Sequence, residues 1–333
     1  MKRIKTSFII LSPFAIGLFS LFIGTYDIPP ITVIKILFQG ITNYNGISNI
    51  PEKAIILDIR LPRILMAATV GASLAGSGAV LQGLLRNPLV DPYILGISAG
   101  AAFGCAITIG FLPSWSVQTM AFIFGLLAVS LTYMVAKSQQ EISRLPLVLS
   151  GVIVSAFFTA LVSIVKILVD PHKLQGIIFW TMGSFSLSDW RNFKIALIGT
   201  IVGILPIVLM RWRLNVMSLS EEEAYALGVN VKRDRMIFIL FSTFSVAVAT
   251  STCGIIGWVG LMVPHIVRMM VGPEHSVLLP LSLFGGAAFM IGADTLSRTF
   301  VGFDVPVGII TALTGAPFFV YLMRKKGKET WES

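Results

Sequence analysis

Long stretches without a charged side chain constrain this sequence more than any other feature. The run from Ile64 to Leu85 is the clearest example, and glycine, alanine and serine crowd it. It is long enough to cross a bilayer core, which takes about 20 residues of α-helix. Small residues let helix backbones approach closely in lipid, so one interpretation is close packing. Arg60 and Arg63 at one end and the Asn87-Pro88 turn at the other favour a second interpretation, a helix that lines a gated path.

Composition places the whole chain in the membrane class. Of its residues, 55% are hydrophobic and only 12% are charged. The mean hydropathy is +0.87, a value that a soluble domain of this length does not reach. We expect an all-α, polytopic membrane protein that forms a single domain over residues 1–333. Pro113 divides one long apolar run, and Cys253-Gly254 with Gly257 divides another. The best count is ten spans, with eight or nine as alternatives, at residues 7–24, 64–85, 93–111, 116–136, 145–169, 195–210, 236–253, 255–270, 277–297 and 305–323.

Basic residues set the expected orientation. The apolar run near the N-terminus lacks a clear small-x-small cleavage site, so it is interpreted as a retained first span. With ten spans both termini lie on one side. That side collects most of the basic residues outside the spans, among them Arg86, the Arg211–Arg235 stretch and the Arg324–Lys328 tail. The positive-inside rule makes it cytoplasmic. Topology therefore accounts for the net charge of +9 without nucleic acid.

The sequence carries no motif for a cofactor or for catalysis. Cys105 and Cys253 lie in apolar runs and imply no disulfide framework, and the histidines match no metal-ligand spacing. No GxxxxGK[ST] phosphate loop and no nucleophile beside a base occur, so no enzyme, cofactor or metal site is predicted. Transport remains, either ion-coupled or driven by a separate ATPase, with a non-transporting scaffold as the third hypothesis. The midplane carboxylate that ion coupling needs is missing.

The cytoplasmic stretch 211–235 is long, polar and organised. The run Ser220–Glu223 offers an N-cap with Glu at the third helical position, and Gly228 is a candidate helix end. Ala224 and Leu227 recur at helical spacing between them. A short amphipathic helix at this place is what a membrane subunit would present to a separate motor protein. The alternative is a solvated connector.

Five groups of motifs follow one another along the chain: RLPR at 60–63, GASLAGSGAVLQ at 71–82 with RNPLVDP at 86–92, EEEAYALGV at 221–229, GIIGWVGLMVPHIVR at 254–268, and ADTLSR at 293–298 with DVPVGIITALTGAPFFVYLMRKK at 304–326. In this order they resemble, nearly end to end, the permease subunits of binding-protein-dependent ATP-binding-cassette (ABC) importers for iron–siderophores, haem and cobalamin, the FecCD type. Two departures from that family are small: Asp304 stands where Glu is usual, and Ser220 where Gly is common.

The resemblance implies partners and a location. It implies a homodimer with the translocation path on its two-fold axis, and a paralogous heterodimer is the alternative. Two ATPase subunits would bind the cytoplasmic face, and a loaded extracytoplasmic substrate-binding protein would bind outside. Membrane lipid of the bacterial or archaeal inner membrane would surround the dimer. The favoured cargo is an iron–siderophore chelate, with haem or cobalamin second and an oxyanion such as molybdate third.

The same resemblance implies roles at the outer face. Arg60, Arg63 and Arg298 match positions that meet acidic residues of the binding protein, whereas interfacial snorkelling is the alternative for them. The apolar stretch 174–188 resembles a short external helix that follows the fifth span. An interfacial aromatic anchor is its alternative.

At the cytoplasmic face the resemblance implies a gate and a coupling helix. The gate would be formed by Asn87, Pro88 and Leu89, with Ser143 near the same constriction. The residues that would meet the ATPase are Glu221, Glu222, Glu223, Ala224, Leu227 and Gly228.

Overall fold

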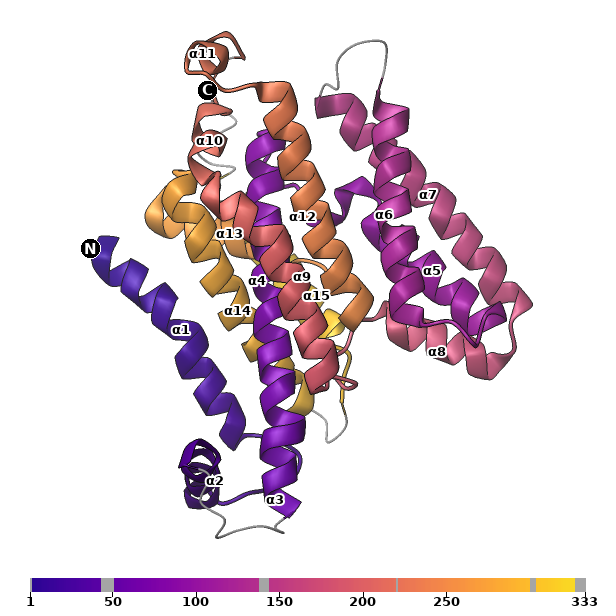
Figure 1. Ribbon diagram of the computed structural model, residues 1–333, viewed down its shortest axis with the longest axis vertical. Helices are drawn as coiled ribbons and strands as arrows, with labels where there is room; N and C mark the ends of the chain where they lie inside the picture. The colour runs from indigo at the N-terminus through magenta and orange to yellow at the C-terminus, as the bar shows by residue number, and fades with distance from the viewer. Residues whose placement is uncertain (1, 43–50, 138–143, 220, 300–303, 327–333) are drawn as a thin grey trace.

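The described part of the chain is helical throughout its regular structure (Figure 1). The computed structural model describes residues 2–42, 51–137, 144–219, 221–299 and 304–326. Within them, seven helices are long and apolar enough to cross a membrane, and three further apolar helices are shorter. Each predicted span falls on one of these ten helices. The predicted fold class, an all-α polytopic membrane protein, is confirmed.

Both predicted breaks within the long apolar runs are also confirmed, because separate helices begin after Pro113 and after Gly257. The helices at the predicted spans are α1 (Lys2–Phe22), α4 (Leu61–Leu85), α5 (Ile97–Phe111), α6 (Val117–Ala136), α7 (Arg144–Leu168), α9 (Trp190–Leu209), α12 (Val231–Cys253), α13 (Val259–Val271), α14 (His275–Thr299) and α15 (Val307–Lys326). The connecting elements are α2 (Pro30–Thr42), α3 (Pro51–Ala54), a π-helical turn (Ile55–Arg60), a 3-10 turn (Pro92–Leu95), α8 (Pro171–Thr181), α10 (Arg211–Val216) and α11 (Glu221–Ala226).

Helix α4 is the centre of the bundle. In its most apolar stretch 78% of the residues are buried, compared with 17% in α1. It packs against α9, α12, α13 and α14. The backbones of α4 and α14 touch, since a Cβ on Gly71 would lie 2.2 Å from the carbonyl oxygen of Gly286. Of the two interpretations of this span, close packing is confirmed, and a helix that lines a gated path stays a prediction.

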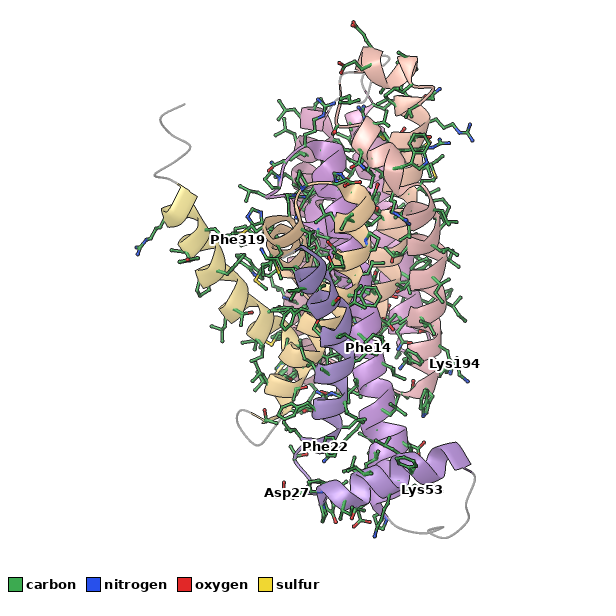
Figure 2. The ribbon with its side chains drawn as sticks, turned by 90° about the vertical axis from the view of Figure 1, so that its left-hand side faces the viewer. Phe14, Phe22, Asp27, Lys53, Lys194 and Phe319 are labelled. Carbon is green, nitrogen blue, oxygen red and sulfur yellow. The ribbon has the colours of Figure 1, made fainter. Side chains whose placement is uncertain are left out.

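The connecting elements mark the two ends of the molecule. Helices α10 and α11 lie at one end, and α2 and α3 lie at the other (Figure 1). We refer to these as the α11 end and the α2 end. Helix α15 packs on α13 and α14 but leans away from the rest of the bundle (Figure 2). The sequence did not predict α2, because its apolar run is too short to stand out as a span.

Candidate functional site

The loop that follows α4 is an exposed turn of defined shape. Arg86 ends α4 in the left-handed conformation, with φ 48°. The Leu89 N–H donates to Oδ1 of Asn87 at 2.9 Å, a side-chain bond that bends the chain. Leu89 is 60% exposed, and Asn87 and Pro88 are exposed beside it. Three of the four predicted gate residues therefore share one turn, whereas Ser143 lies outside the described residues.

Arg86 joins this turn to the segment that leads into α11. Its guanidinium donates to the carbonyl oxygen of Met217 at 3.0 Å and also to that of Leu219. Both carbonyls lie in the short connection between α10 and α11. From the sequence, Arg86 counted only as one of the basic residues on the predicted cytoplasmic side. Its contacts could not be predicted, because a side chain that binds backbone carbonyls leaves no pattern in the sequence.

Helix α11 is short and ends where the sequence predicted. Gly228 has φ 77°, its N–H donates to Tyr225 O at 2.9 Å, and the Val229 N–H donates to Ala224 O at 3.0 Å. This pair of bonds is a Schellman ending, which needs a left-handed residue and so favours glycine. The helix therefore has a fixed exit toward α12.

The exposed face of α11 differs in part from the predicted one. Glu222, Glu223 and Leu227 are exposed, with Leu227 at 58%. Ala224, however, is fully buried against this chain, because α11 packs on α12. Tyr225, 49% exposed, is the apolar surface residue that the sequence reading missed. Glu221 begins the helix, and Ser220, the predicted cap, lies outside the described residues.

Three arginines meet near the α2 end, and all three are buried. Nε of Arg63 lies 2.9 Å from Asp294 Oδ1, and its Nη1 lies 2.9 Å from Asp304 Oδ2. Nε of Arg298 lies 3.3 Å from Asp294 Oδ2. Arg60 donates to the carbonyl oxygens of Leu21, in the last turn of α1, and Tyr26, which follows α1. The sequence reading pictured these guanidinium groups as available to a partner, but here their acceptors belong to the same chain.

We refer to Arg60, Arg63 and Arg298 with their two aspartates, Asp294 and Asp304, as the arginine cluster. Asp304 is its accessible residue. Its side chain is 36% exposed, whereas that of Arg63 is 8% exposed. Burial opposes ionisation of Asp304, but the hydrogen bond and charge of Arg63 and a hydrogen bond from Ser186 outweigh it, so its pKa lies below the usual value. A depressed carboxyl pKa means that the pair stabilises the fold at neutral pH and is lost on strong acidification.

A second group of polar side chains joins the connection between α4 and α5 to the connection between α12 and α13. Asp91 caps the 3-10 turn by accepting from the Tyr93 N–H at 2.9 Å. The Tyr93 hydroxyl lies 3.2 Å from Thr250 Oγ1 and accepts from the Ile256 N–H at 3.4 Å. The break between α4 and α5 is thereby bound to the break between α12 and α13. The turn at residues 87–89, the predicted gate, thus precedes a segment that side-chain hydrogen bonds hold in place.

Comparisons with known proteins match nearly the whole chain. The model of the FecCD transport family matches residues 11–325. The "Probable iron chelatin transport system permease protein" of Helicobacter pylori is 45% identical over 81% of this chain and 82% of its own length. The cobalamin import system permease protein BtuC of Halobacterium salinarum is 43% identical over 83% of this chain and 76% of its own. The molybdate import system permease protein MolB of Haemophilus influenzae is 40% identical over 83% of each.

A solved structure gives the same result for the fold. An inward-facing ABC transporter assigned to the metal-chelate type superposes with a TM-score of 0.83 at 36% identity. The superposition covers 98% of this chain and 100% of that one.

Proposed function

The chain belongs to the FecCD transport family as a multi-pass permease subunit of an ABC importer of the metal-chelate type, and we propose that its cargo is an iron–siderophore-type chelate. The observation that supports this cargo is the 45% identity to the relative named for an iron chelatin. Haem or cobalamin is the alternative cargo, and molybdate is the next, because relatives named for cobalamin and molybdate are 43% and 40% identical.

We further propose that the α11 end faces the cytoplasm of a bacterial or archaeal cell and that both termini lie there. The support is the excess of basic residues at this end under the positive-inside rule. Two copies of this chain form the path in this proposal. Two separate ATPase subunits hydrolyse ATP below them, and a binding protein delivers cargo at the α2 end.

The contacts at the α11 end suggest how a movement driven by ATP hydrolysis is passed to the proposed gate at residues 87–89. The ATPase grips the exposed side of α11, where Leu227 and Tyr225 offer apolar surface beside the acidic residues. Movement of α11 displaces the connection before it, whose carbonyls hold Arg86. Arg86 in turn begins the turn that carries Leu89. One guanidinium thus links the coupling helix to the gate.

At the α2 end, docking of the binding protein proceeds by exchange of carboxylates. Asp304 occupies the outward side of Arg63 in the free permease. A carboxylate of the binding protein that took its place would gain the same charge-assisted hydrogen bond. Arg60 and Arg298 keep the ends of α1, α4 and α14 aligned while this happens.

Uptake by cells that lack their own copy of this gene tests the cargo. The strain receives the permease with the ATPase and binding protein from the same organism, and uptake of radioactive ferric hydroxamate, haem, cobalamin and molybdate is measured. We expect ATP-dependent uptake of the ferric chelate, which an excess of the unlabelled chelate competes away. Uptake of one of the other three compounds, with none of the ferric chelate, would replace the proposed cargo.

A further inference from the structure

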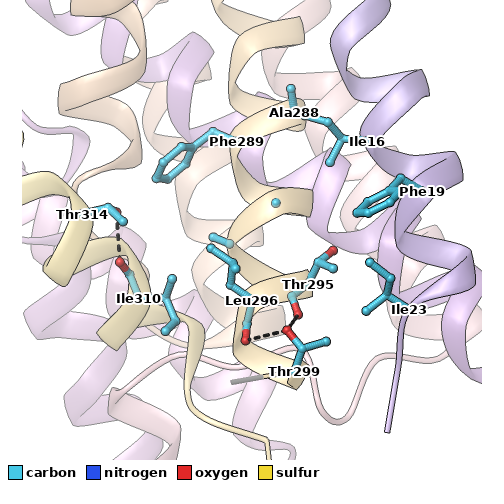
Figure 3. Close-up of a pocket in the computed structure, with 12 residues that line it drawn as sticks. Ile16, Phe19, Ile23, Ala288, Phe289, Thr295, Leu296, Thr299, Ile310 and Thr314 are labelled. Carbon is cyan, nitrogen blue, oxygen red and sulfur yellow. Dashed lines mark hydrogen bonds between the residues drawn. The ribbon is translucent and has the colours of Figure 1, made fainter. Parts of the chain in front are cut away.

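An apolar groove lies between α1, α14 and α15 (Figure 3). Its cavity volume is about 630 Å³. Ile16 and Phe19 form the α1 wall, Ile310 belongs to the α15 wall, and Phe289 and Gly292 lie on α14 between them. We refer to this as the α1–α15 groove.

The groove offers nothing to a polar ligand. Its described lining includes no Asp, Glu, Lys or Arg, and its only hydroxyl groups belong to threonines. Each of these is already bonded within the chain: Thr295 to Ile291 O at 2.7 Å, Thr299 to Thr295 O at 2.9 Å and Thr314 to Ile310 O at 2.9 Å. A polar occupant would lose its hydrogen bonds with water and gain none. The chemistry that fits is a hydrocarbon.

The dimensions of the groove select among hydrocarbon occupants. Along α14 it runs from Ala288 to Thr299, which is about 16 Å at the rise of an α-helix. Half of a bilayer core is about 15 Å thick, so this length matches the acyl region of one leaflet. A helix from another subunit would span the whole bilayer core, about 30 Å, which is about twice the length of this groove.

The position of the groove makes it continuous with the lipid-facing surface. Phe14 and Leu18 on α1 and Leu313 on α15 are exposed apolar residues of the same spans. Thr299 is the last residue of α14, and Ile23 follows the last residue of α1, so the groove reaches the α2 end. We propose that the α1–α15 groove binds one acyl chain of a membrane phospholipid from the leaflet at the α2 end. The bound chain supports α15 on the side that faces α1 across the groove.

Gly292 allows the groove to be filled without disturbing the bundle. A Cβ at this position would meet no atom within 4 Å, so a leucine there extends into the cavity. Ser130 on α6 is the control, because it is small and exposed on a span but does not line the groove, whereas Gly292 is half-buried in the groove. A leucine in place of Ser130 adds equal bulk elsewhere on the lipid-facing surface.

Retention of phospholipid by the full-length protein tests the proposal. Wild type, Gly292→Leu and Ser130→Leu are reconstituted in vesicles of phosphatidylethanolamine and phosphatidylglycerol, extracted, washed in detergent and weighed by native mass spectrometry. We expect one retained phospholipid per protein molecule in wild type and Ser130→Leu. The amount of retained phospholipid should be at least tenfold lower in Gly292→Leu. Equal retention in Gly292→Leu and wild type would overturn the proposal, as would no retention in wild type.

A second measurement on the unmodified protein guards against misfolding of the variant. Phosphatidylethanolamine with a diazirine near the end of one acyl chain is added to the vesicles, and the crosslinked peptides are mapped. We expect labelling to concentrate on the groove segments of α1 and α14, and it should not depend on which cargo the importer carries. Labelling spread evenly over all exposed spans would show ordinary surrounding lipid only. Crosslinks from the groove to a second copy would assign it to the dimer interface instead.

Discussion

At the scale of single residues, Arg86 carries the proposed link between ATP hydrolysis and the gate. Replacing it with glycine keeps the left-handed turn, which glycine adopts without strain, but removes the guanidinium that holds Met217 O and Leu219 O. One lost bond is partly buried and the other is exposed, and together they are worth about 1 kcal/mol, or about a fivefold change in coupling. We therefore expect Arg86→Gly to raise the ATP hydrolysed per chelate imported into proteoliposomes about fivefold.

Arg86→Lys is the matched variant for this prediction. It keeps a positive charge and one donor group but loses the planar fork, so it should give an intermediate ratio. Co-purification of the ATPase should remain normal in both variants. An unchanged ratio in Arg86→Gly would leave Arg86 with only a local structural role.

Asp304 tests docking at the same scale. If a partner carboxylate must displace it from Arg63, then Asp304→Asn should tighten binding of the binding protein by about fivefold at neutral pH and low salt. Neutral pH is the correct condition, because the depressed pKa keeps Asp304 ionised and paired there. Surface plasmon resonance on the reconstituted permease measures the affinity.

Asp27 provides the control for the pairing of Arg63. It is exposed, lies at the α2 end and has the same charge (Figure 2), but its charge acts on Arg60 rather than on Arg63. Asp27→Asn should change the affinity only slightly. Equal effects of the two substitutions would mean that Asp304 acts through general electrostatics rather than by holding Arg63.

At the scale of an element, α11 is the contact with the ATPase in the proposed function. Its most exposed apolar residue is Leu227. Leu227→Asp would place a carboxylate in the contact, and burying it unpaired costs on the order of several kcal/mol. We expect this variant to insert in the membrane but to lose ATPase co-purification almost entirely. Leu219→Asp is the control, because Leu219 is 41% exposed nearby but precedes α11. Loss of the ATPase from both variants alike would remove the assignment to α11.

The spans could be predicted from the sequence, and several side-chain orientations could not. Hydropathy identifies a helix that crosses lipid, because its backbone bonds are local and its side chains must be apolar. The partner of Arg63, in contrast, is Asp294, which is 231 residues away along the chain. Only the packing of α4 against α14 brings the two together. The burial of Ala224 likewise depends on α12, so helical spacing alone assigned it to the wrong face.

At the scale of the whole molecule, α4 connects the two ends of the bundle. It runs from the arginine cluster at the α2 end to Arg86 at the α11 end, and it packs against α9, α12, α13 and α14 between them. Close packing on several sides opposes bending of such a helix. In the proposed function, displacement at one end of α4 is therefore passed to the other end.

The last prediction concerns the pair of subunits. If two copies form the path on a two-fold axis, a residue at the axis meets its own copy, and the gate turn is the part that should do so. Leu89→Cys should therefore crosslink to a dimer with a short bis-maleimide reagent in at least one nucleotide state of the complex with its ATPase. The native thiols Cys105 and Cys253 are buried and should not react appreciably, so no cysteine-free background is needed. Ser130→Cys, exposed on α6, should take up a single maleimide without forming dimers. A Leu89→Cys protein that reacts with the monofunctional reagent but never crosslinks would place the gate turns apart and reject their meeting on the axis.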